Sequence, residues 1–357
     1  MTTRTRVAVV GGGAVGLTTA YDLATRGAHV EVFDRGAFGS GSTERAAGIV
    51  YDAYAEDVDV ALAERAIERF REFSGERDFR LTPAPYLWFT TDGGASAAAI
   101  REQAERMRHH GREVELVESD DIRREFPVLR VDDIAVGAIA RTAGVADPSA
   151  YVALLVRKVR EAGATLHSET PASVALDPPR VNDTAYDAVV VTAGAWTKRV
   201  LADVAVSVPL RPYRVQALVA GGPSVPIFYD ADEEYYVRPH PEGLLAGDGV
   251  TDGEADPDDF AEATDDWFRE ETRRRLRRRL VNADVPLSRS WAGVCAGTPD
   301  NDPLLGELAD GLYIGAGWGG HGFMRAPALG ERLALQVLGE RDGVGPFDPT
   351  RFGAGDA

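Results

Sequence analysis

The sequence of 357 residues contains a single cysteine, Cys295, and only two lysines, Lys158 and Lys198. One cysteine excludes an internal disulfide and is typical of a protein from a reducing cytosol. No run of eighteen apolar residues occurs, so a transmembrane segment is not expected. The N-terminus also lacks the basic and apolar regions of a secretory signal. We therefore predict a cytoplasmic protein.

Positive charge is scarce relative to negative charge. The chain has 57 acidic residues against 39 lysines and arginines, and its formal net charge is −18. Such a surface suits a halophilic cytoplasm, where salt screens most of the self-repulsion. The alternative is a GC-rich genome, whose preference for arginine over lysine codons would explain the scarcity of lysine. In either case the overall field repels nucleic acid and anionic membranes, so neither partner is expected.

Clusters that hold metals or perform nucleophilic catalysis are also missing. The closest histidines, His109 and His110, lie at the expected end of a helix, so no metal site is predicted. No Ser-His-Asp set is recognisable, and we assign no catalytic residue. Six arginines between Arg273 and Arg279 end a helix expected over residues 260–280, which begins with acidic residues. This order matches the helix dipole and favours a solvated helix over nucleic-acid contact.

The first 35 residues do contain a recognisable pattern. Residues 7–10 predict a buried strand, residues 14–26 a helix and residues 29–33 a second strand, which together form a βαβ unit. Asp34 ends the second strand, where a carboxylate accepts hydrogen bonds from ribose hydroxyls. The order of these features indicates a dinucleotide site, against the alternative of a glycine-rich turn without a ligand.

Glycines at the turn of this unit specify the contact with the ligand. Gly11 permits a tight turn, Gly13 lets the backbone approach a pyrophosphate, and Gly16 lets helix and strand pack closely. The first helical residues, Ala14 and Val15, supply N–H groups for the phosphates. NAD and FAD share this pattern, so other segments must distinguish them.

Three further segments favour FAD. They are Gly39-Ser40-Gly41-Ser42-Thr43-Glu44-Arg45-Ala46-Ala47-Gly48-Ile49, then Val191-Thr192-Ala193-Gly194-Ala195-Trp196, and finally Tyr313-Ile314-Gly315-Ala316-Gly317-Trp318-Gly319-Gly320-His321-Gly322-Phe323-Met324. The glycines of the third segment let backbone N–H groups approach a flavin ring, where they stabilise negative charge. The alternative is an ordinary strand-to-helix turn, which does not account for so many glycines. We expect the helix after this segment over residues 328–338.

In their order along the chain, these segments resemble the D-amino-acid oxidase family of flavoproteins, which includes glycine oxidase, sarcosine oxidase and D-amino-acid dehydrogenases. The resemblance extends to Tyr235-Tyr236-Val237-Arg238-Pro239, to Trp291-Ala292-Gly293 and to Thr298-Pro299-Asp300. It implies an α/β fold in which a Rossmann-type FAD-binding domain is interleaved with an α+β antiparallel-sheet substrate domain. It also implies oxidation of the C–N bond of an amino acid or related amine by hydride transfer to flavin.

The resemblance and the changes in sequence texture predict discontinuous domains. The FAD-binding domain is expected over residues 1–80, 144–208 and 289–345, the substrate domain over 81–143 and 209–288, and a poorly specified C-terminal tail over 346–357. The predicted FAD contacts are Gly11, Gly13, Ala14, Val15, Gly16, Asp34, Arg35, Ser42, Thr43, Arg45, Ala46, Ala47, Gly48, Ala172, Ala193, Gly194, Trp196, Gly317, Gly319, Gly320, His321, Gly322, Phe323 and Met324. Ala172 is the residue that the resemblance places beside the adenine.

The substrate end departs from the family's patterns. Cys295 stands where relatives place an arginine that clamps the substrate carboxylate, and Met324 stands where sarcosine oxidases place a lysine. Either Arg214, Arg45 or Arg325 replaces these cations, or the substrate is not a simple α-amino acid. The candidates for the substrate pocket are Ile49, Arg214, Tyr236, Cys295, His321 and Met324. Packing in a strand is an equally good explanation for Tyr236, and a surface position for Arg214.

Gly293 occupies the position of the cysteine that binds flavin covalently in sarcosine oxidases, so we expect non-covalent FAD. Oxygen or another compound accepts the electrons. The alternatives to an amino-acid oxidase are a flavoprotein dehydrogenase for another amine or a 2-hydroxy acid, an NAD-dependent dehydrogenase, and a non-catalytic binding module.

Overall fold

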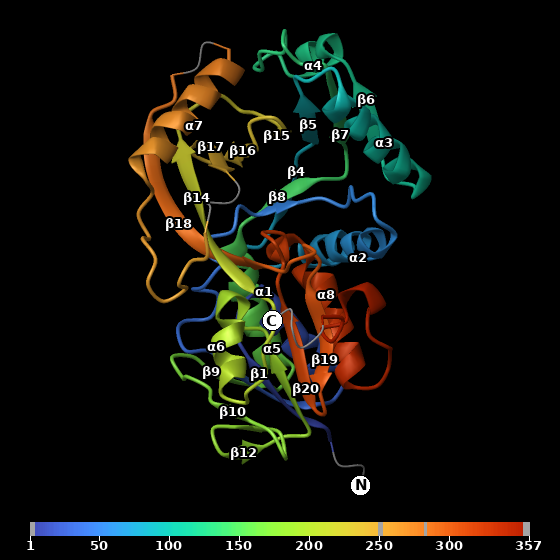
Figure 1. Cartoon of the computed structure of the whole chain (residues 1–357), viewed down its shortest axis with the longest axis vertical. Helices are drawn as coiled ribbons and strands as arrows, with labels where there is room; N and C mark the ends of the chain where they lie inside the picture. The colour runs from blue at the N-terminus through green and yellow to red at the C-terminus, as the bar shows by residue number, and fades with distance from the viewer. Residues whose placement is uncertain (1–3, 249–252, 282–283, 353–357) are drawn as a thin grey trace.

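The computed structural model describes residues 4–248, 253–281 and 284–352, which form two lobes built around two large sheets (Figure 1). The lower sheet in the figure has six strands in the order β19-β20-β13-β1-β2-β9. Their bounds are β1 (Arg6–Val10), β2 (His29–Phe33), β9 (Thr165–His167), β13 (Ala188–Val191), β19 (Leu304–Ala309) and β20 (Leu312–Ala316). All neighbours pair in parallel except β19 and β20.

Both faces of this sheet are covered, which explains why its central strands are almost wholly apolar. One face packs against the helices α1 (Ala14–Thr25), α2 (Asp57–Phe73), α5 (Pro148–Glu161) and α8 (Gly322–Val337). The other face packs against α6 (Thr197–Ala202) and a small sheet of β10 (Val174–Ala175), β11 (Arg180–Val181) and β12 (Thr184–Ala185). Asp147 caps α5 by accepting hydrogen bonds from the N–H groups of Ser149 and Ala150, as its place before Pro148 predicts.

The upper sheet has eight strands in the order β18-β14-β17-β16-β15-β5-β7-β6. Their bounds are β5 (Tyr86–Thr90), β6 (Val114–Val117), β7 (Val136–Ala140), β14 (Arg211–Ala220), β15 (Ile227–Asp230), β16 (Tyr235–His240), β17 (Gly243–Asp248) and β18 (Leu287–Gly297). Pairing is antiparallel except between β5 and β15. One face buries α7 (Asp266–Arg279), and α3 (Ala95–His109) packs against β5, β6 and β7.

Short elements complete the chain. A three-stranded sheet of β3 (Ile49–Val50), β8 (Gly144–Ala146) and β4 (Leu81–Pro83) lies between the lobes, and α4 (Ser119–Glu125) is at the far end of the upper lobe (Figure 1). The 3-10 turns are η1 (Gly194–Trp196) and η2 (Gly345–Phe347). No helix among the described residues is long and apolar enough to cross a membrane. The predicted α/β class, with parallel and antiparallel sheets, is confirmed.

The structure corrects three predicted elements. Helix α7 begins at Asp266 rather than at residue 260, because residues 256–265 instead make turns and bonds to other segments. Helix α8 begins at Gly322 rather than at Ala328, so the glycine-rich loop runs directly into its first turn. The segment after Gly339 is better specified than expected, since Phe347 is fully buried within it.

A residue of the C-terminal segment also ties it to the lower lobe. The guanidinium of Arg351 donates to the carboxylate of Asp300 at 2.8 and 2.9 Å and to the carbonyl oxygens of Asp302 and Pro303. The domain division remains a prediction. Strand β18 pairs along its length with β14 in the upper sheet, although residues 289–297 fall in the segment assigned to FAD binding.

Candidate active site

A cavity of about 1180 Å³ lies where the carboxyl ends of β1 and β2 meet the upper sheet. Its lining residues come from both lobes, from the loop of residues 35–48 and from the start of α8. Every residue predicted to contact FAD lines this cavity except Gly16. A Cβ atom on Gly16 would lie 1.9 Å from the carbonyl oxygen of Gly11, so this glycine has the helix–strand packing role that the motif predicts.

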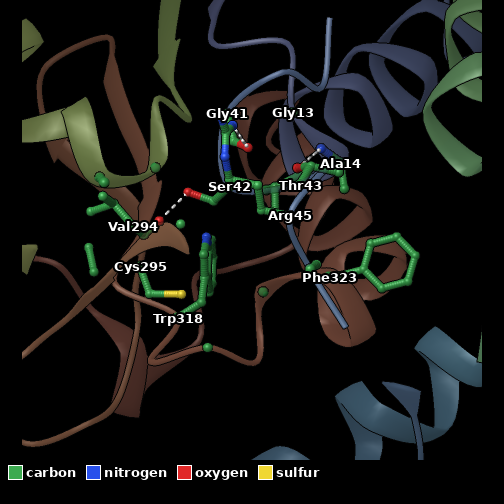
Figure 2. A pocket seen from close by; sticks show the side chains of 18 of the residues that line it. Gly13, Ala14, Gly41, Ser42, Thr43, Arg45, Val294, Cys295, Trp318 and Phe323 are labelled. Carbon is green, nitrogen blue, oxygen red and sulfur yellow. Dashed lines mark hydrogen bonds between the residues drawn. The ribbon is translucent and has the colours of Figure 1, made fainter. Parts of the chain in front are cut away.

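The N-terminus of α1 faces the cavity, and its own N-cap residue provides no side-chain cap. Gly13 is its N-cap residue, and Gly11 adopts a φ of 106°, which a residue with a side chain rarely adopts. The N–H of Ala14 donates to Oγ1 of Thr43 at 3.1 Å, which joins the helix to the loop of residues 35–48 (Figure 2). An uncapped helix N-terminus is a binding site for an anion such as a pyrophosphate.

Asp34 lies beside this helix end. Its Oδ2 accepts the N–H of Gly12 at 2.7 Å, and its Oδ1 accepts the N–H of Gly36 at 2.8 Å. Burial raises the pKa of Asp34, and these two hydrogen bonds oppose the shift. Because each carboxylate oxygen can accept a second hydrogen bond, the group keeps capacity for ribose hydroxyls.

An aromatic and charged group forms the wall next to Asp34. The guanidinium of Arg35 lies 4.5 Å from the ring centroid of Trp196. Both side chains donate to Oδ1 of Asp258, Arg35 at 2.6 Å and Trp196 at 2.7 Å. Asp258 lies two residues before the predicted start of a helix at residue 260, and its bonds here help to explain why that helix begins only at Asp266.

The upper sheet holds the loop of residues 35–48 in place. The hydroxyl of Ser42 donates to the carbonyl of Val294 at 2.6 Å (Figure 2), and the indole N–H of Trp291 donates to the carbonyl of Arg45 at 3.3 Å. The guanidinium of Arg238 donates to the carbonyl of Ala47. Two strands of the upper lobe, β16 and β18, therefore fix a loop of the lower lobe against the cavity.

The start of α8 supplies a second uncapped helix N-terminus. Gly317, Gly319 and Gly320 have φ values of 83°, 56° and 87°, which favour glycine, and His321 is the N-cap residue without a side-chain cap. His321 is exposed to the cavity. Desolvation of the ring by the cavity walls and the nearby Arg325 lower the pKa of His321 to about 4, so its imidazole is neutral at pH 7.

These features fit FAD. The cavity has room for an extended cofactor, and it presents two helix N-termini at separate places, the first suited to a pyrophosphate and the second to the electron-rich edge of a reduced flavin. Figure 2 shows how residues of both lobes, among them Thr43, Val294 and Trp318, converge on this space.

Comparison with known proteins agrees with this geometry. The model of the DAO family, described as FAD dependent oxidoreductase, matches residues 6–336. The chain belongs to this family. The predictions of the family and of its cofactor, FAD, are thereby confirmed.

Individual relatives differ in length. Human mitochondrial sarcosine dehydrogenase is 26% identical over 97% of this chain, but the match covers 41% of that protein. Glycine oxidase of Geobacillus kaustophilus is also 26% identical, with 98% of each chain covered. The solved structure of L-proline dehydrogenase from P. horikoshii superposes with a TM-score of 0.89 at 26% identity, covering 99% of this chain and 98% of the other. This chain thus spans about two fifths of the sarcosine dehydrogenase and nearly all of the other two.

The structure brings together five of the six residues predicted for the substrate pocket. Ile49, Tyr236, Cys295, His321 and Met324 all line the cavity. Burial raises the pKa of Tyr236 beyond its usual range and that of the Cys295 thiol to about 11, so both groups are neutral. The sixth, Arg214, is not among the described residues that line the cavity, and its role in substrate binding remains a prediction.

Arg214 is directed at the segment before α7. Its Nη1 lies 2.8 Å from Oδ2 of Asp265, and its other nitrogens donate to the carbonyl oxygens of Ala261 and Ala263. Among the described residues, Arg214 does not contribute to the cavity lining. In the strand β14, the alternation of side chains places Tyr213 and Val215 on the cavity face and Arg214 on the opposite face.

The other two arginines considered as replacements are also engaged. Arg325 forms a buried ion pair with Asp59 at 2.5 Å and lies outside the described cavity lining. Arg45 lines the cavity, but its Nη1 donates to the carbonyl of Ser40 at 2.6 Å and its Nη2 to Glu262 at 3.2 Å.

An aromatic wall is absent from the sequence-based predictions. The tyrosines Tyr51, Tyr86, Tyr213 and Tyr229, together with Trp318 and Phe260, also line the cavity. The period-two pattern of the strands gives the signal for Tyr213, which shares its face with Val215. Tyr86 lies in β5, which pairs with β7 on one side and with β15 on the other. Its position beside β15 cannot be predicted from the sequence, because this parallel pair joins segments that are far apart in the chain.

Proposed function

We propose that this protein is an FAD-dependent enzyme that oxidises the C–N bond of an amine or amino acid and holds its cofactor without a covalent bond. The observation that carries the proposal is the cavity between the two uncapped helix N-termini of α1 and α8 in a chain of this family. Gly293, at the position of the covalent attachment site suggested by the resemblance, supports non-covalent binding.

Each part of the cavity has a proposed role in holding FAD. The residues Gly11, Gly13, Ala14, Val15, Ser42 and Thr43 bind the pyrophosphate, and Asp34 binds the ribose. Arg35, Ala172, Ala193, Gly194 and Trp196 surround the adenosine. The backbone of Arg45, Ala46, Ala47, Gly48, Gly317, Gly319, Gly320, His321, Gly322, Phe323 and Met324 surrounds the flavin.

When bound, FAD supplies the acceptor for a hydride from the carbon next to the substrate nitrogen. The protein's task is to bind the substrate in the correct orientation and to exclude water. The ring of Tyr236 and the side chains of Ile49 and Met324 provide an apolar wall for this purpose. Because His321 is neutral, it does not repel an amine that approaches the start of α8.

The setting of the reaction is part of the proposal. The acidic composition supports a halophilic cytoplasm, and oxygen or another compound accepts the electrons. The arginines of α7 support the absence of a nucleic-acid role, since Arg274, Arg275 and Arg278 all bond to Glu233. Arg279 differs from the solvated position expected for it, because it is buried and pairs with Asp230 and Asp133.

Anaerobic titration of the purified yellow protein tests the function. Substrate oxidation should bleach the flavin absorbance near about 450 nm. The panel should contain sarcosine, glycine and L-proline, after the named relatives, together with D-amino acids and N-methylated amines without a carboxylate. A colourless preparation that binds NAD, or a yellow one that no amine bleaches, contradicts the proposal. Acid precipitation should leave the colour in the supernatant if FAD is non-covalent.

A further inference from the structure

Acidic residues outnumber basic residues in the described lining of the cavity. The charged residues that line it are Asp34, Arg35, Arg45, Glu234, Asp248, Asp258 and Glu262. Both cations are already bound by protein groups. Arg35 lies against Trp196 and Asp258, and Arg45 donates to Ser40, Gly41 and Glu262. Both arginines also lie in the loop of residues 35–48, at the part of the cavity assigned to the cofactor.

The opposite side of the cavity, here called the upper-lobe wall, is lined by residues 49, 51, 86, 213, 215, 229, 234, 236, 248 and 293–296. Among the described residues, this wall presents no lysine or arginine to the cavity. Two buried arginines lie behind the lining. Arg238 donates to the carbonyl oxygens of Ala47 and Pro239, and Arg325 pairs with Asp59. A substrate carboxylate in this part of the cavity would therefore lose its hydration without meeting a free cation, which is unfavourable.

The same wall is rich in groups that attract a cation. Tyr51 and Tyr86 are stacked with ring centroids 4.7 Å apart, and Tyr229 and Tyr236 are directly opposite each other on β15 and β16. All four line the cavity. The faces of aromatic rings carry partial negative charge and attract ammonium groups, most strongly where water is excluded.

Two carboxylates border these rings. Glu234 is exposed in the turn between β15 and β16 and acts electrostatically on Tyr229. Asp248 ends β17, lies 3.8 Å from Arg275 and acts electrostatically on Tyr236. Because Arg275 partly neutralises Asp248, Glu234 is the carboxylate whose charge is more available to a ligand.

We propose that the substrate is a diamine-like amine: one nitrogen is oxidised at the flavin, and a second, cationic group is held by the tyrosine faces and Glu234 in place of the usual substrate carboxylate. This inference rests on the proposed function. It goes beyond that function in naming the charge of the group that the upper-lobe wall recognises.

Three ligands of equal chain length isolate this charge. N-Methyl-1,4-diaminobutane, N-methylbutylamine and 4-(methylamino)butanoate carry an ammonium, a methyl and a carboxylate group at the far end. Their dissociation constants for the holoprotein are measured from the change in flavin fluorescence or absorbance at one salt concentration. We expect the diamine to bind at least about tenfold more tightly than the carboxylate, with N-methylbutylamine, whose far end is uncharged, between them. Tightest binding of the carboxylate, equal binding of all three or no binding of the diamine overturns the inference.

Variants of Glu234 and Tyr236 test which residues bind the cationic end of the ligand. Glu234→Gln, at an exposed turn, should weaken binding of the diamine about threefold and leave binding of N-methylbutylamine, whose far end is uncharged, unchanged. Tyr236→Phe keeps an aromatic face and should retain diamine binding, whereas Tyr236→Leu should weaken it. If the hydroxyls instead hold a carboxylate, Tyr236→Phe weakens binding of 4-(methylamino)butanoate and Glu234→Gln strengthens it.

Ligand binding and flavin reduction test the two proposals separately. Bleaching by 4-(methylamino)butanoate together with its tighter binding leaves the proposed function intact and overturns the diamine inference. Tight diamine binding without bleaching by any amine leaves the recognition of the cation intact and contradicts the proposed function.

Discussion

At the scale of single residues, Cys295 provides a direct probe of the cavity. It faces Tyr213 across the β14–β18 pair, and burial raises the pKa of its thiol to about 11. The thiolate is the reactive form, so alkylation of the native holoprotein should be slow at about pH 7.5 and rise about tenfold per pH unit up to about pH 9.5. Mass spectrometry of the single alkylated site measures the rate.

The unfolded protein is the control, because its cysteine has a pKa near about 8.5 and its rate should level off above that pH. A native rate that levels off below about pH 9 would show that the thiol does not have the environment seen here.

The raised pKa of Asp248 predicts how the stability of the protein depends on pH. Burial raises its pKa from 3.8 to about 6, so between these values the folded protein retains a proton that the unfolded chain has released. The free energy of unfolding should therefore fall as pH rises from about 4 to 6, by up to about 3 kcal/mol from this group. Asp248→Asn should remove this contribution and be more stable than the wild type at about pH 7.5.

Chemical unfolding at several pH values measures the difference between Asp248→Asn and the wild type. Other groups titrate in the same range, so Asp78→Asn, at an exposed position, serves as the matched variant. If Asp248→Asn exceeds the wild type in free energy of unfolding by the same amount at about pH 4.5 as at about pH 7.5, the pKa of Asp248 is not the cause.

At the scale of elements, the junction between the glycine-rich loop and α8 couples folding to cofactor binding. A Cβ atom on Gly322 would lie 2.8 Å from Cδ1 of Trp318, which itself lines the cavity. Gly322→Ala should lower the conformational entropy of the unfolded chain, a gain of up to about 1 kcal/mol, but displace the indole. We expect little change in stability of the apoprotein and FAD binding weaker by about tenfold, an effect of roughly 1.4 kcal/mol.

FAD titration of the apoprotein, followed by flavin fluorescence, measures this effect. Gly345→Ala is the matched control, because a Cβ atom there meets no atom within 4 Å. An unchanged affinity for FAD in Gly322→Ala would mean that the position of Trp318 does not matter for the cofactor.

The elements also show what could be predicted from the sequence. The βαβ unit over residues 7–33 is predictable because its signals are local: glycines at a turn, apolar strands and an acidic residue at a strand end. Cavity residues near these signals, such as Asp34 and Thr43, follow from them. The predicted start of α7 is wrong because the acidic residues before it bond to distant partners, as Asp258 does with Arg35 and Trp196.

The upper-lobe wall is the least predictable part of the cavity, because it also depends on contacts between residues that are distant in the sequence. Its residues come from strands whose order in the sheet differs from their order in the chain, and β5 lies beside β15 across more than a hundred residues. The sequence motifs identify the missing cations at Cys295 and Met324. They give no sign that tyrosines from several strands face the same space.

At the scale of the whole molecule, the net charge of −18 determines how stability should depend on salt. Ion pairs such as Arg351 with Asp300 offset some acidic residues locally, but an excess of negative charge remains and repels itself in the folded state. Raising KCl from about 0.1 to 2 M shortens the screening length from about 10 Å to below about 3 Å. The repulsion should weaken more than the close ion pairs do, because the repulsion acts over longer distances.

We therefore expect the midpoint of thermal unfolding to rise by at least about 5 °C over this range, the shift that roughly 4 kcal/mol produces in a protein of 357 residues. A double variant on the exposed face of α3, Glu102→Lys with Glu105→Lys, reduces the net negative charge by four units. It should raise the midpoint at low salt and reduce its increase with salt. KCl and a non-ionic osmolyte must be compared, since general exclusion from the surface also stabilises folded proteins. If the double variant and the wild type respond equally to KCl, preferential exclusion rather than screening explains the stabilisation, and the acidic composition then gives no support to adaptation to salt.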